Sequence, residues 1–139
     1  MDYGTCASQS SHKIITAEEN GRKLTIKNPT ARLIRRVKVD GCLENIAGKR
    51  CDYLFEIDDP SAQVIYLELK GCDIEKAYAQ LVATLELFQP IHKNCKKACH
   101  IVASRVPKAA PKTQQLNIRL QKAKQATLHI STQQAVIDV

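Results

Sequence analysis

The chain has 139 residues, of which 44% are hydrophobic and 25% are charged. This balance is typical of a soluble globular domain and argues against a disordered chain, so we expect one domain over residues 1–139. No apolar run approaches the roughly 20 residues that a membrane helix needs, and the first residues lack the apolar segment of a secretory signal. We therefore expect a cytoplasmic protein that does not contact a membrane.

The formal net charge of +7 is unevenly distributed along the chain. Residues 1–91 carry 12 basic and 13 acidic side chains, whereas residues 92–139 carry nine basic side chains and one acidic side chain. A one-sided basic surface favours a polyanion partner, the alternative being a solvated face without a partner. The nine residues expected to bind nucleic acid are Lys93, Lys96, Lys97, Arg105, Lys108, Lys112, Arg119, Lys122 and Lys124.

The first half of the chain predicts antiparallel strands joined by tight turns. Residues 13–27 hold two short apolar segments around Asn20-Gly21, a common hairpin signal. Aromatic and β-branched residues predict three more strands, at residues 32–39, 51–57 and 64–70. A turn at residues 58–61 joins the last two strands into a hairpin.

The second half predicts helices that alternate with strands. Asp73 suits a helix N-cap, and apolar residues then recur at spacings of three and four until Pro90 stops the helix. The apolar run at residues 99–106 predicts a buried strand. Residues 113–126 predict a basic amphipathic helix, although an alternating strand is also possible there. Short strands are expected at residues 127–131 and 135–139, which gives an α/β fold with a mixed sheet.

Two acidic residues are predicted to face each other in the hairpin of residues 51–70. If this hairpin is symmetric about Pro60, then Asp52 lies opposite Glu68, with Cβ atoms roughly 4.5–5.5 Å apart. Because side chains alternate along a strand, Lys70 shares the face of Glu68. The other face, with Ile65, Leu67 and Leu69, is expected to be core. On the first strand, Cys51 is expected on the face opposite to that of Asp52.

This arrangement fits metal-assisted hydrolysis of a phosphodiester. Opposed carboxylates repel each other unless a cation lies between them, and Mg²⁺ binds in proteins through one or two carboxylates while it keeps several waters. Lys70 places a positive charge where it could orient a water and offset charge on a phosphate. The alternative is a surface strand with ordinary alternating charges.

The segment Asp-Tyr-Leu-Phe at residues 52–55, followed by a turn, Ile-Tyr-Leu-Glu-Leu-Lys-Gly at residues 65–71 and a helix, resembles the PD-(D/E)XK superfamily of nucleases. The resemblance covers residues 48–106. It implies a restriction-endonuclease-like core, in which a central mixed β-sheet is flanked by helices. It also implies that Asp52, Glu68 and the Leu69 carbonyl bind Mg²⁺, for which Mn²⁺ can substitute, and that Lys70 is the catalytic lysine.

Two features depart from the pattern of this superfamily, and one further position matches it. Cys51 replaces the usual proline before the aspartate. The superfamily usually takes a further acid from a first helix, and no such helix is legible here; the candidates for this acid are Glu18, Glu19 and Asp40. Gln80 matches a helix position that points into the site in some members, but its place on the helix surface favours a residue outside the site.

The six cysteines are expected to be reduced thiols, because four of them lie in or beside apolar segments. The spacing of His92, Cys95, Cys99 and His100 approaches that of zinc ligands. Cys99 and His100 follow each other on a strand and point to opposite faces, so free thiols are favoured over a zinc site.

The resulting hypothesis is a Mg²⁺-dependent deoxyribonuclease, structure-selective or part of a defence or recombination system. A homodimer is expected by analogy with junction resolvases, and the chain could also be one subunit of a larger assembly. The alternatives are a non-catalytic nuclease-like module that binds nucleic acid or protein, and an immunity-type domain with an acidic partner. Five more basic residues either extend the basic surface or form a solvated strand face: Arg35, Arg36, Lys38, Lys49 and Arg50.

Overall fold

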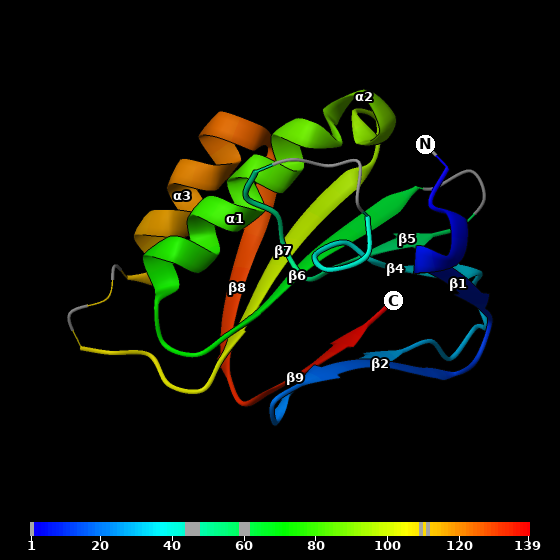
Figure 1. Cartoon of the computed structure of the whole chain (residues 1–139), viewed down its shortest axis with the longest axis horizontal. Helices are drawn as coiled ribbons and strands as arrows, with labels where there is room; N and C mark the ends of the chain where they lie inside the picture. Colours follow the sequence, from blue (N-terminus) through cyan, green and yellow to red (C-terminus); the bar gives the residue numbers. More distant parts are fainter. Residues whose placement is uncertain (1, 44–47, 59–61, 109, 111) are drawn as a thin grey trace.

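Two β-sheets and a layer of helices build the structure (Figure 1). It is a computed structural model that describes residues 2–43, 48–58, 62–108, 110 and 112–139. Within these residues the elements are, in chain order, η1 (Gly4–Cys6), β1 (Ala7–Ser10), β2 (Ile14–Glu19), β3 (Arg22–Lys27), β4 (Ile34–Lys38), β5 (Tyr53–Ile57), β6 (Gln63–Lys70), α1 (Ile74–Leu87), α2 (Gln89–His92), β7 (Lys96–Ala103), α3 (Thr113–Lys124), β8 (Ala126–Thr132) and β9 (Gln134–Asp138).

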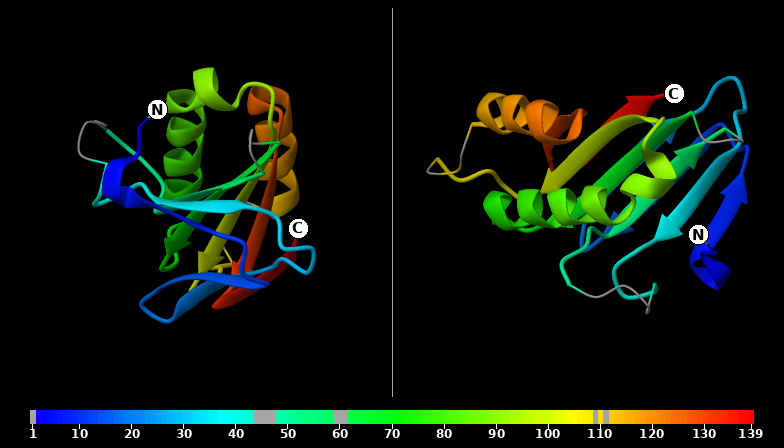
Figure 2. Two further views of the ribbon diagram at one scale, coloured as in Figure 1. Left: turned by 90° about the vertical axis from the view of Figure 1, so that its right-hand side faces the viewer. Right: turned by 90° about the horizontal axis from the view of Figure 1, so that it is seen from above.

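The larger sheet is mixed, as the sequence predicts. Its six strands follow the order β1-β4-β5-β6-β7-β8, with antiparallel pairs from β1 to β6 and parallel pairs from β6 to β8. The parallel strands are connected through α1 and α3, which lie side by side over one face of this sheet (Figures 1 and 2). The prediction of an α/β fold with a large mixed sheet and flanking helices is confirmed.

A second sheet, which the sequence does not reveal, covers the other face. Its strands follow the order β2-β3-β9, with β2 and β3 antiparallel and β9 parallel to β3. The predicted turn at Asn20-Gly21 joins β2 to β3, and both residues have positive φ angles (52° and 79°), as a two-residue hairpin turn requires. Figure 2 shows this small sheet packed on the side away from the helices.

The register of the β5–β6 hairpin agrees with the symmetric pairing expected from the sequence. Tyr53 pairs with Leu67 and Leu54 pairs with Tyr66. The same register places Asp52, the residue before β5, opposite Glu68. The turn residue Pro60, on which the expectation was centred, lies outside the described residues.

Strand β6 is buried on both faces, whereas the sequence predicts a core on one face. Val64 and Tyr66 belong to a hydrophobic cluster shared with the helices, and Ile65 and Leu67 belong to a second cluster shared with the small sheet. The face assigned to Cys51 is wrong. Cys51 lies in the helix-side cluster, because it precedes β5 and the alternation of the strand does not extend to it.

The predicted helices are confirmed, with small differences at their ends. The Asp73 carboxylate accepts a hydrogen bond from the Lys76 N–H at 3.0 Å and caps α1. Pro90 lies in the first turn of α2, where a missing N–H costs no hydrogen bond. In α3, Leu116 and Leu120 are buried and Ile118 is half exposed, so the helical spacing prevails over the alternating one.

A disulfide between Cys6 and Cys42 contradicts the expectation that all six cysteines are reduced. It connects the end of η1 to the turn after β4, two positions that are distant in the sequence and adjacent in space. Cys51, Cys72, Cys95 and Cys99 form no disulfide among the described residues. In this part of the chain, no helix is long and apolar enough to cross a membrane.

Candidate active site

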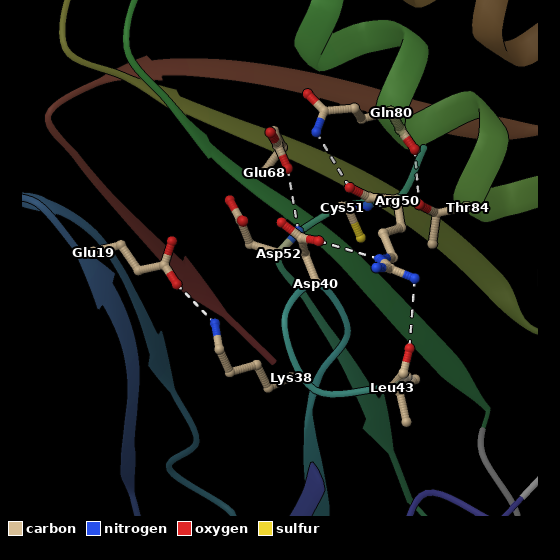
Figure 3. Close-up of polar contacts among 10 residues, drawn as sticks. All are labelled: Glu19, Lys38, Asp40, Leu43, Arg50, Cys51, Asp52, Glu68, Gln80 and Thr84. Atoms are coloured by element: carbon tan, nitrogen blue, oxygen red, sulfur yellow. Dashed lines mark hydrogen bonds and ion pairs between the residues drawn. The ribbon is translucent and has the colours of Figure 1, made fainter. Parts of the chain in front are cut away.

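Asp52 and Glu68 hold each other in place through the backbone. The Glu68 Oε1 atom accepts a hydrogen bond from the Asp52 N–H at 3.1 Å, and the Asp52 Oδ2 atom accepts one from the Leu69 N–H at 2.8 Å. Each carboxylate is therefore bonded to the strand that carries the other. Figure 3 shows the two side chains side by side where β5 begins and β6 ends.

The two carboxyl groups are poorly stabilised as anions. Burial raises the pKa of Glu68 to about 8, and the negative charge of Asp52 adds to this effect, against a lowering by Lys70. Burial also raises the pKa of Asp52, against the lowering effect of its hydrogen bond from Leu69. The Glu68 side chain is only 2% exposed, and the Lys70 Nζ atom lies 3.9 Å from its Oε2 atom. The centre thus disfavours the ionised forms of both carboxyl groups, and Lys70 offsets this effect on Glu68 only in part.

Two of the three candidates for a further acid lie near this pair. The charges of Glu19 and Asp40 both raise the pKa of Asp52. Glu19 belongs to the inward-facing residues of β2 and forms an ion pair with Lys38 at 2.8 Å, whereas Asp40 binds Arg50 at 3.1 Å (Figure 3). Glu18 is exposed, because it points away from the larger sheet.

Gln80 reaches this end of the sheet from α1, although the sequence favours a residue outside the site. Its Nε2 atom donates a hydrogen bond to the Arg50 carbonyl at 3.3 Å, two residues before Asp52 (Figure 3). Among the described residues, its Oε1 atom is buried and has no hydrogen-bond partner. Buried amide oxygens are nearly always bonded, so this oxygen is available to a water or a ligand in the site.

The oxygen atoms present suit a hard divalent cation. Within the described residues, no group of three or more histidine, cysteine, aspartate or glutamate side chains is placed to hold a metal ion. Mg²⁺ needs only one or two carboxylates and completes its shell with carbonyls, waters and substrate oxygens. Asp52 and Glu68 would be its side-chain ligands and Leu69 the source of the backbone carbonyl.

The nine basic residues of the last third do not form one surface around this site. Within strand β7, Lys97 lies beside Val64 and Ala103 lies beside Lys70, and these two positions are about 20 Å apart at roughly 3.3 Å per residue. The last residue of β7 lies beside Lys70. Three exposed basic residues follow it in the chain, namely Arg105, Lys108 and Lys112. Five lie near the opposite end, namely Lys93, Lys96, Lys97, Lys122 and Lys124. Arg119 lies between them, 5.8 Å from the ring of Tyr78.

The basic residues of the first half mostly bind other groups within the chain. Arg35 forms an ion pair with Glu56 at 2.8 Å, and Arg36 donates to the Thr16 carbonyl at 2.9 Å. Lys38 and Arg50 bind the two acids beside Asp52, as described above. These residues therefore shape the surroundings of the site, a role that the sequence does not reveal because their partners lie in other strands.

The residues with zinc-like spacing do not converge. His92 is buried, with its ring nitrogens 2.6 Å from the Tyr66 hydroxyl and 2.6 Å from Glu56. Cys99 packs in the helix-side cluster, whereas His100 points to the other face and stacks on His129 with ring centroids 4.8 Å apart. The sequence argument against zinc, that Cys99 and His100 point to opposite faces, is confirmed.

The chain matches no protein-family model, and neither the curated proteins nor the solved structures show a significant similarity to it.

Proposed function

We propose that this chain is a Mg²⁺-dependent deoxyribonuclease of the PD-(D/E)XK type, with a restriction-endonuclease-like core. The observation that carries the proposal is the buried pair of Asp52 and Glu68, which are bonded reciprocally and whose pKa values are both raised. Strongly perturbed groups concentrate at functional sites, because structural needs alone favour partners that stabilise the charge.

The order of the elements supports the same proposal. The antiparallel strands β4, β5 and β6, the helix α1 and the parallel strand β7 follow one another along the chain. This is the order that the resemblance to the superfamily implies. The first helix expected in that superfamily has no counterpart before β4, where the described residues hold only the short helix η1.

In the proposed mechanism, Asp52 and Glu68 would hold the ion at the open end of the hairpin, where β5 begins and β6 ends. The ion, when bound, supplies a Lewis acid that lowers the pKa of water and polarises the scissile phosphate. Lys70, with its side chain 26% exposed, donates hydrogen bonds to the phosphate or to the attacking water and offsets developing negative charge. Gln80 would orient a water through its unbonded oxygen.

The DNA backbone would be held by Arg105, Lys108 and Lys112, which are exposed at the end of the sheet that carries Lys70. Contacts of this kind position a duplex without reading its bases, so binding should weaken steeply as salt rises. Cleavage of both strands of a duplex needs two centres, which a homodimer would supply. Structure-selective cleavage in a defence or recombination system, within a larger assembly or alone, is compatible with this arrangement.

The test is cleavage of supercoiled plasmid and of a labelled branched duplex in the presence of Mg²⁺, Mn²⁺ or EDTA. The wild type should nick DNA only with a divalent ion. Lys70→Ala should lower the rate by about 10²-fold or more while DNA binding in EDTA persists. Lys76→Ala is the matched control, because it removes an exposed lysine from the nearby first turn of α1 and should leave cleavage unchanged.

Absence of cleavage by folded wild-type protein that still binds DNA would contradict the enzyme. It would favour the non-catalytic nuclease-like module instead. Heparin and polyphosphate would then separate the two non-enzymatic alternatives. They should displace the ligand of a module that binds nucleic acid, and they should not displace a protein partner.

A further inference from the structure

A pocket of about 390 Å³ lies at the end of the molecule opposite to Lys70. It opens where α1 and α3 end and where β7 begins, the region near α2 in Figure 1. The polar residues that line it come from α1, α2, β7 and α3 and from the residue that ends α3. They are Glu86, Gln89, Lys97, Lys122, Lys124 and Gln125.

Lys97 is the unusual residue of this pocket. It is only 6% exposed, because its position in β7 directs it beneath the helix layer. An ammonium group has three N–H donors. Among the described residues, the hydrogen bond that Lys97 makes is a long one, 3.4 Å to the Cys95 carbonyl, and no carboxylate forms an ion pair with it. A buried ammonium with so little compensation is costly, and an anion in the pocket would offset that cost.

The other lining residues also favour an anion. Glu86, the acidic residue of the lining, forms an ion pair with Lys124 at 2.9 Å. Its charge is therefore offset by Lys124, and Lys97 and Lys122 give the pocket a net positive charge. Gln89 and Gln125 add amide groups that can donate hydrogen bonds. Cations and amide donors around a cavity of this size match a group with several acceptor oxygens, as a phosphate has.

We propose that this pocket binds a phosphate group, about 20 Å from the reacting centre at Lys70. If the chain is the deoxyribonuclease proposed above, the phosphate belongs to the DNA backbone, about six nucleotides from the cleaved bond at 3.4 Å per nucleotide. A free phosphate or a nucleotide would use the same chemistry. The basic residues then serve two separate phosphate contacts, one beside the reacting centre and one in this pocket.

The experiment measures binding by isothermal titration calorimetry in EDTA, where no cleavage occurs. The ligands are inorganic phosphate, pyrophosphate and duplexes of four and sixteen base pairs, and the variants are Lys97→Met and Lys96→Met. Lys97→Met keeps the aliphatic stem in its buried position. Lys96→Met is the matched control, because Lys96 is the neighbouring, exposed residue on the opposite face of β7.

We expect Lys97→Met to weaken pyrophosphate binding at least tenfold and Lys96→Met to leave it unchanged. Lys122→Gln, which alters an exposed side chain, should also weaken pyrophosphate binding. Thermal unfolding shows whether each variant folds. Lys97→Met should also weaken binding of the sixteen-base-pair duplex. It should not weaken binding of the four-base-pair duplex, which is too short to reach both the reacting centre and the pocket.

Weaker pyrophosphate binding with unchanged DNA binding would keep the phosphate site and assign it to a free phosphate or a nucleotide. No effect of Lys97→Met or Lys122→Gln on any of these ligands would overturn the proposal. Plasmid cleavage with Mg²⁺, measured separately, tests the nuclease itself. A negative result in either experiment therefore does not affect the interpretation of the other.

Discussion

Glu56 and Glu68 are both buried carboxylates, and their surroundings affect them in opposite directions. Glu56 lies within 2.8 Å of the Tyr3 hydroxyl, the His92 ring and the Arg35 guanidinium. Burial alone would raise its pKa, but these hydrogen bonds lower it to about 2. The pKa of Glu68 is raised to about 8. The fold thus stabilises the ionised form of Glu56 and destabilises that of Glu68. The first pattern is expected for a structural residue and the second for a functional one.

Glu68→Gln should therefore stabilise the protein in the absence of metal. At pH 9 the Glu68 carboxyl is ionised against burial and against Asp52, and the neutral amide removes both costs. We expect the free energy of unfolding to rise by on the order of 2 kcal/mol at pH 9 in EDTA and to change little at pH 5. Urea unfolding at the two pH values measures this difference. Equal stability of wild type and variant at pH 9 would contradict the electrostatic description of the site.

Glu56→Gln should have the opposite effect. The folded pKa of Glu56 is lower than its ordinary value of 4.5, so its charge stabilises the fold above that value and loses this effect as the pH falls towards 2. We expect a loss of about 3 kcal/mol at pH 7 that shrinks between pH 4.5 and pH 2. Chemical unfolding across this range tests it, and a loss that does not depend on pH would point to packing instead.

At the scale of elements, the sequence predicts best what depends on neighbours in the chain. The register of β5 and β6 follows from alternating side chains and a short turn, and α1 follows from its apolar spacing and its Asp73 cap. The neighbours of Asp52 from elsewhere could not be predicted. Glu19 belongs to another sheet, and its approach depends on how that sheet packs on the larger one. Local patterns carry no information on such packing.

Helix α1 also fixes the start of β5, through Thr84. Its hydroxyl oxygen accepts a hydrogen bond from the Cys51 N–H at 2.7 Å and donates one to the Gln80 carbonyl at 2.7 Å. Thr84→Val keeps the shape and leaves the buried N–H without a partner. We expect a loss of about 1–3 kcal/mol in the free energy of unfolding.

If Asp52 and Glu68 bind Mg²⁺ as proposed, Thr84→Val should also weaken that binding, because the backbone N–H that loses its partner adjoins Asp52. Calorimetric titration of Mg²⁺ measures that effect, and Thr84→Ser is the control that retains the hydroxyl. Unchanged stability and metal affinity in Thr84→Val would show that α1 does not position the strand.

At the scale of the whole molecule, the two ends of the larger sheet differ in their chemistry. The end with Lys70 carries the buried acids and three exposed basic residues, and the end with Lys97 carries the lysine-lined pocket. The charge count in the sequence predicts the basic surplus but not this division. The division arises because β7 and α3 run in opposite directions and return the chain to the far end.

The Cys6–Cys42 disulfide should contribute strongly to global stability. It closes a segment with a sequence separation of 36, for which loss of chain entropy in the unfolded state gives about 4 kcal/mol. We expect Cys6→Ser with Cys42→Ser to lower the free energy of unfolding by about that amount. A reducing agent should lower the stability of the wild type equally and leave the double variant unchanged. A double variant as stable as the oxidised wild type would contradict this prediction.

The hydrogen bond from the Leu69 N–H to the Asp52 carboxylate has a spectroscopic consequence. Leu69 is 4% exposed, so this amide proton is shielded from solvent and its magnetic environment is set largely by the oxygen it binds. An ion that draws electron density from Asp52, or a proton that neutralises it, would weaken the hydrogen bond and shift the amide resonance. One buried backbone signal near the end of β6 can therefore report the occupancy of the centre, without a substrate and without a change of side chain.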